Sequence, residues 1–104
     1  MNTKSFFELR FGTYPNGGFS FVVKTCPKQD DAKIEHPMFD DKTTDTIFNI
    51  LKKFSKNKSN VKIELFPVSN GEWKSILIIN REQVSLTEGA CIQDAVAKMS
   101  AATH

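Results

Sequence analysis

The sequence predicts an α+β domain in which two β-hairpins form a four-stranded antiparallel sheet with two helices packed on one face, in the order ββαββα. Two pairs of segments alternate apolar and polar residues around an Asn-Gly pair, at 16–17 and at 70–71, as hairpin strands do. Each pair is followed by apolar residues at helical spacing. The chain has 104 residues, 39% hydrophobic and 25% charged, which suits a single domain over residues 1–104.

The first hairpin is expected over residues 5–25. Its apolar face consists of alternate residues of both strands: Phe7, Leu9, Phe11, Phe19, Phe21 and Val23. A three-residue loop with a glycine bulge pairs Phe11 with Val23 and keeps these residues on one face. A two-residue turn at 16–17 would split them, so we expect the longer loop.

An acidic connection follows. Residues 26–41 contain two prolines and five acids and show no periodicity. Loops of this length are uncommon in compact domains and are often functional. We expect residues 28–41 to form a mobile element that covers the sheet or touches a partner. The alternatives are a passive connection anchored by Phe39 or a short strand near residues 33–39.

The first helix is expected over residues 43–56. Its apolar stripe is Ile47, Ile50, Leu51 and Phe54, which recur at the spacing of one helix face. Asp41 or Thr43 is the expected N-cap. Lysines crowd the last turns, where cations complement the helix dipole.

The second hairpin and second helix repeat this plan. A two-residue turn at 70–71 pairs Leu65 with Ile76 and Ile63 with Ile78, so that these residues face the helices. Residues 85–88 read Ser-Leu-Thr-Glu, a capping box that predicts a helix start. The apolar stripe of that helix is Ile92, Ala95, Val96 and Met99.

The helix-free sheet face carries the functional prediction. The second hairpin is apolar on both sides, and an exposed apolar patch usually marks an interaction site. We therefore expect a small non-enzymatic accessory protein that binds a protein partner, or a second copy of itself, through this face. The candidate partner-binding residues are Trp73, Phe66, Val68, Leu77, Ile79, Phe6 and Arg10. Trp73 is the expected hot spot, since Trp dominates the centres of interfaces; the alternative is that the chain's own loop covers the face through Met38 and Phe39.

Nucleic-acid binding by the same face is the second hypothesis. Its candidate residues are Arg10, Lys24, Lys62, Lys74 and Arg81, with Phe6, Phe66 and Trp73 available for base stacking. The net charge of +2 is small, and the pI of about 8.6 lies below that of most dedicated nucleic-acid binders. Glu8 and Glu64 on the same face also weigh against it.

No motif predicts catalysis, a cofactor or a metal site. The sequence has no P-loop, no GxGxxG and no CxxC, and its histidines are His36 and His104. Cys26 and Cys91 lack the paired spacing of a zinc site. No 18-residue apolar run is present, so we expect no membrane span and no membrane partner. Glu8 and Arg10 interrupt any signal-peptide core, so we expect a cytoplasmic location. Frequent Lys, Asn, Ile and Phe suit a phage or bacterial accessory protein.

Overall fold

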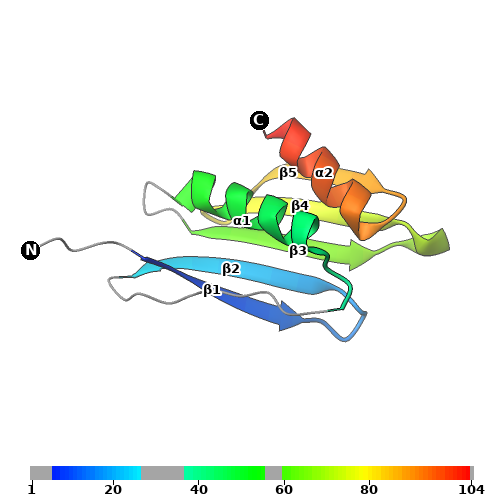
Figure 1. Ribbon diagram of the computed structural model, residues 1–104, viewed down its shortest axis with the longest axis horizontal. Helices are drawn as coiled ribbons and strands as arrows, with labels where there is room; N and C mark the ends of the chain where they lie inside the picture. The colour runs from blue at the N-terminus through cyan, green and yellow to red at the C-terminus, as the bar shows by residue number, and fades with distance from the viewer. Residues whose placement is uncertain (1–5, 27–36, 56–59, 104) are drawn as a thin grey trace, which may run out of the picture.

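The computed structural model describes residues 6–26, 37–55 and 60–103, with the backbone alone for residues 6–9 and 24–26. The described elements follow the chain as ββαβββα (Figure 1): β1 (Phe6–Thr13), β2 (Phe19–Cys26), α1 (Asp41–Ser55), β3 (Val61–Pro67), β4 (Trp73–Ile79), β5 (Glu82–Gly89) and α2 (Ile92–Ala102). The predicted α+β fold with an antiparallel sheet and two helices is confirmed. The sheet has five strands in the order β1-β2-β3-β4-β5, however, and not four.

The β1–β2 hairpin has the expected loop length in a shifted position. The ladder pairs Phe11 with Phe21, two residues away from the predicted partner. The N–H of Tyr14 donates to the carbonyl of Gly18 at 2.9 Å, which closes a three-residue loop over residues 15–17. The last loop residue is a glycine with a φ of 89°, a conformation that glycine adopts at low cost. Because a shift of two residues preserves the alternation, the apolar face stays intact.

The predicted β3–β4 register is wrong by one residue. Ile63 pairs with Leu77 and Leu65 with Ser75, where the two-residue turn required Ile78 and Ile76. The connection is longer than a two-residue turn, because the N–H of Val68 donates to the carbonyl of Glu72 at 2.7 Å. It includes the short 3₁₀ turn η1 (Ser69–Gly71).

A register shift of one residue sends every side chain of a strand to the opposite face. Leu77 is therefore fully buried under the helices, and Ile76 and Ile78 lie on the helix-free face, where they are half-buried.

The predicted capping box at residues 85–88 is also wrong. These residues belong to β5, which pairs with β4 along the edge of the sheet. Helix α2 begins at Ile92, and its N-cap is Cys91, whose Sγ accepts from the N–H of Asp94 at 3.4 Å. The predicted apolar stripe of this helix is confirmed, since all four of its residues are buried.

Helix α1 begins two residues before the predicted start. Its cap is Asp40, whose Oδ1 accepts from the N–H of Thr43 at 2.8 Å, and not Asp41 or Thr43. Hydrogen bonds from the side chain and the backbone of Thr43 hold the pKa of the Asp40 carboxyl below its ordinary value. The expected stripe is confirmed: Ile47, Ile50 and Leu51 are buried, and Phe54 packs against the core.

The core lies between the helices and one face of the sheet (Figure 1). Phe39, at the entry to α1, is buried there, and its ring meets Phe19 edge-on at 5.1 Å and Phe21 at 5.5 Å. The proposed cover of the helix-free face by Phe39 is therefore wrong, because its ring packs on the other side of the sheet. Residues 28–36 of the predicted mobile loop lie outside the described residues.

Candidate interaction face

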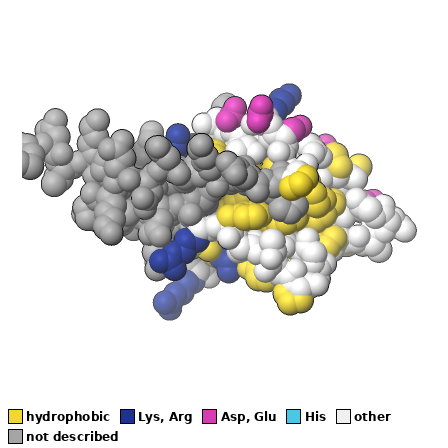
Figure 2. All heavy atoms as spheres, turned by 60° about the horizontal axis from the view of Figure 1, so that its bottom comes forward, with side chains coloured by type: hydrophobic (Ala, Val, Ile, Leu, Met, Phe, Trp, Pro, Cys, Tyr) yellow, Lys and Arg dark blue, Asp and Glu magenta, His cyan; other side chains and the backbone are white. Residues whose placement is uncertain are grey.

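The helix-free side of the sheet, called here the open face, presents side chains from all five strands. Those described are Arg10, Ser20, Val22, Lys62, Glu64, Phe66, Lys74, Ile76, Ile78, Gln83, Val84, Leu86 and Glu88. Apart from the two residues at the bulge in β5, each alternates along its strand with a residue that is on the helix side. Figure 2 views the molecule from below and shows hydrophobic side chains near the centre, acidic side chains at the upper margin and basic ones at the lower left.

The apolar stripe of the open face consists of Ile76, Ile78, Val84 and Leu86. In the ladder, Ile76 lies directly beside Leu86. Val84 is the extra residue of a β-bulge in the edge strand and is 52% exposed, and Leu86 is 45% exposed. Strand β4 is thus apolar on both faces, a pattern typical of strands covered on both sides.

A polar network borders the stripe. The hydroxyl of Tyr14 donates to Oε2 of Glu64 at 2.6 Å, and Nζ of Lys62 lies 3.8 Å from the same oxygen. The ring of Phe66 stacks on Tyr14 with centroids 5.3 Å apart, and Nζ of Lys74 lies 5.8 Å from the Phe66 centroid. Both charges of the Lys62–Glu64 pair are therefore partly compensated within the face.

Three of the predicted partner-binding residues lie on the other side of the sheet. Trp73, Leu77 and Ile79 face the helices as a consequence of the corrected register. Leu77 is fully buried, and Trp73 stacks on Phe19 with centroids 5.9 Å apart. The placement of Trp73 as an exposed hot spot is therefore wrong: its ring extends the hydrophobic core.

The other predicted residues are distributed as follows. Phe66 and Arg10 lie on the open face, whereas Val68 is 38% exposed in the β3–β4 connection. The side chain of Phe6 lies outside the description.

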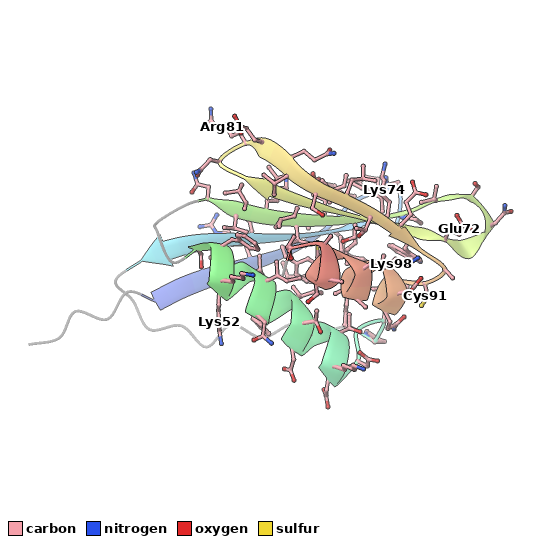
Figure 3. The ribbon with its side chains drawn as sticks, turned by 90° about the horizontal axis from the view of Figure 1, so that it is seen from above. Lys52, Glu72, Lys74, Arg81, Cys91 and Lys98 are labelled. Atoms are coloured by element: carbon pink, nitrogen blue, oxygen red, sulfur yellow. The ribbon has the colours of Figure 1, made fainter. Side chains whose placement is uncertain are left out.

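The basic residues proposed for nucleic acid do not form one site. Lys62 and Lys74 share the open face with Arg10, and the side chain of Lys24 is not described. Arg81 is in the β4–β5 turn, and Figure 3 shows it far along the sheet from Lys74.

None of the four residues of the apolar stripe is among the partner-binding residues predicted from the sequence. Residues 76–79 read Ile-Leu-Ile-Ile, so either face of β4 is apolar and the pattern does not choose a register. The alternation of Val84 and Leu86 with polar neighbours is the signal of a strand. The match of Ser85 and Glu88 to a capping box instead predicts a helix start at the same residues.

The helix side has one groove of interest, where the N-terminal ends of α1 and α2 meet. It measures about 360 Å³ and is lined by Asp40, Thr43, Cys91 and Asp94, among others. The carboxylates there already accept backbone hydrogen bonds: the N–H of Ala90 lies 3.1 Å from Asp94 and, with Lys98, lowers the pKa of that carboxyl. Within the described residues, no three His, Cys, Asp or Glu side chains are placed to hold a metal ion.

The fold and the face together define an α+β domain whose five-stranded sheet is covered by helices on one side. No protein-family model, curated protein or solved structure matches the chain. In the described part of the chain, neither helix has the length and apolar character needed to cross a membrane. Function is therefore inferred from the open face.

Proposed function

We propose that this protein is a non-enzymatic binding module that engages a protein surface, of a partner or of a second copy, through the open face. The apolar stripe carries the proposal. Antiparallel sheets with a solvated face usually place polar residues there, whereas β4 and β5 place Ile76, Ile78, Val84 and Leu86. A contiguous apolar area of this kind usually marks an interaction site.

The energetic argument is modest in size. Complete burial of a Val, Leu or Ile side chain stabilises by about 1.5–3 kcal/mol. Val84 and Leu86 are each about half exposed, so covering them contributes about 1 kcal/mol apiece. Ile76 and Ile78 add less because they are already half-buried. The stripe is therefore suited to reversible binding rather than to a permanent complex.

Nucleic acid is the less well supported occupant. The ring of Phe66 is already stacked with Tyr14 and approached by Lys74, so its faces are largely engaged. Lys62 has Glu64 within 3.8 Å, and that carboxylate disfavours a phosphate nearby. Apolar side chains at 76, 78 and 86 offer no contact to a phosphate backbone, which dominates nucleic-acid affinity.

The test is site-specific cross-linking in cells of the source. A photoreactive amino acid replaces Leu86 in one variant and Val68, an exposed apolar residue outside the stripe, in the matched control. We expect protein adducts at position 86 that are absent at position 68. Equal adducts at both positions contradict the proposal, and adducts with DNA or RNA at position 86 favour the nucleic-acid alternative.

A further inference from the structure

We infer that the occupant of the open face is a second copy of this chain, stacked face to face about a two-fold axis that runs across the strands. This inference rests on the proposed function, that the open face binds a protein surface. It adds the identity of the partner and the position of the symmetry axis. Closed two-fold dimers are the commonest assemblies of identical chains, and their interface must be complementary to itself.

The register of the ladder divides the open face into three rows across the sheet. The central row is Ser20, Glu64, Ile76 and Leu86. On one side lies the row of Arg10, Val22, Lys62, Ile78 and Gln83, and on the other the row of Phe66, Lys74 and Glu88. A two-fold axis along the central row brings that row onto its own copy and exchanges the two outer rows.

This axis gives its favourable contacts in the central row. Ile76 and Leu86 meet their counterparts, which joins the two apolar stripes into one. In the outer rows, Lys62 comes over Phe66, Ile78 comes over Lys74 and Gln83 comes beside Glu88 of the second copy. Stacked sheets align within about 30°, so these residues stay in the same neighbourhoods after rotation.

The central row also brings Glu64 near its own copy. This like-charge contact is compensated within each chain, because Glu64 accepts a hydrogen bond from Tyr14 at 2.6 Å and has Lys62 at 3.8 Å. Each copy therefore supplies its own Lys62 ammonium to offset the charge of its Glu64.

The other in-plane axis, along the strands, is unfavourable. Because β3 is the central strand, this axis lays both Lys62 and Glu64 on their own copies. It also places Ile76 and Leu86 over β2 and β1, where the ladder positions are Ser20 and Gly12. The apolar stripes would then be separated, so the apolar pattern of the face selects the axis across the strands.

The area of the face suits a weak dimer. Strands lie about 4.8 Å apart and rise about 3.3 Å per residue, so five strands of about seven residues cover roughly 550 Å². Two such faces remove roughly 1,100 Å², close to the lower bound of about 1,000 Å² for specific interfaces. We therefore expect a dimer that depends on concentration.

The experiment uses Leu86, which the two-fold axis places against itself. Sedimentation equilibrium of the full chain is measured from about 1 µM to about 1 mM, the range of weak association. We expect the wild type to dimerise, and Leu86→Glu and Leu86→Lys each to weaken dimerisation by at least about tenfold. A mixture of the two variants is expected to restore the dimer, because opposite charges then meet at the axis. Val68→Glu is the matched control and is expected to dimerise like the wild type.

Three results overturn the inference. The first is a wild type that stays monomeric throughout the range. The second is a dimer that Leu86→Glu leaves intact although circular dichroism shows an unchanged fold. The third is a mixture of the Glu and Lys variants that stays monomeric. A monomeric wild type that still forms protein adducts at position 86 refutes only the second copy as occupant, and leaves the binding role of the open face standing.

Discussion

At the residue scale, the β4–β5 turn contains backbone strain that the residue pattern of the sequence does not indicate. The turn has two central residues, Asn80 with a φ of 52° and Arg81 with a φ of 70°. This is the geometry of a type I′ turn, which favours Asn followed by Gly. Asn80 is well suited, since its Oδ1 also accepts from the N–H of Asn60 at 3.0 Å. The backbone of Arg81 lies in the left-handed region, where the Cβ of a non-glycine residue causes strain.

We expect Arg81→Gly to raise the free energy of unfolding by about 0.5–1 kcal/mol, because glycine relieves the strain at positive φ but loses more entropy on folding. The measurement is equilibrium urea unfolding. Arg81→Ala is the matched control: it removes the same charge, keeps the Cβ and is expected to give no gain. If Ala stabilises as much as Gly, charge and not backbone strain is the cause.

At the scale of elements, the sequence predicts a face well where alternation is one-sided. In β2, the buried residues Phe19, Phe21 and Val23 were identified from their spacing alone, and both helix stripes were identified in the same way. These elements have a polar side that excludes the alternative. Strand β4 has none, because Ile76, Leu77 and Ile78 fit a core equally well in either register.

The register of β4 was therefore decided by its turn and not by its pattern. Asn70 and Gly71 both have positive φ, of 66° and 76°, as an Asn-Gly hairpin turn requires. They belong to a longer connection, however. Its one additional residue turns the opposite face of β4 toward the helices. The predicted partner-binding site depends on this register, so it places Trp73 on the wrong face of the sheet.

Strand β5 was missed for a different reason. It is an edge strand whose side chains are mostly exposed. Its sequence therefore contains few apolar residues that would indicate a packed strand. Glu82 and Glu88 stand near its ends, and charges on edge strands discourage pairing with other chains.

The corrected register makes a prediction about two adjacent residues. We expect Leu77→Ala to lower the free energy of unfolding by about 2–4 kcal/mol, because it opens a cavity in the core. Ile76→Ala is expected to lower it by about 1 kcal/mol or less, because Ile76 is half-buried on the open face. Urea unfolding at low protein concentration measures both values without a contribution from association. A larger loss for Ile76→Ala than for Leu77→Ala would restore the register inferred from the turn.

At the scale of the whole molecule, the sheet has central strands that are paired on both sides and two edge strands that are paired on one side. The hairpins place β1 and β5 at the edges, and β3 has neighbours on both sides. Both helices and the ring of Phe39 cover one face. The molecule therefore offers two kinds of surface to another chain, the open face and the outer edges of β1 and β5. Pairing at an edge protects backbone amides from exchange, whereas stacking on the open face does not.

Amide hydrogen exchange distinguishes the two surfaces. We expect the slowest exchange in β3, whose hydrogen bonds are shared with β2 and β4 under the helices, because such segments open only with global unfolding. The outward amides of β5 are expected to exchange at least about tenfold faster, since an edge strand leaves alternate N–H groups unpaired. Stacking through the open face leaves these edge amides in water, so their exchange should stay fast even at concentrations that produce the dimer. Slow exchange of the outward β5 amides that develops with concentration would instead mean that the copies pair edge to edge, as a continuous sheet, and would contradict stacking of the open faces.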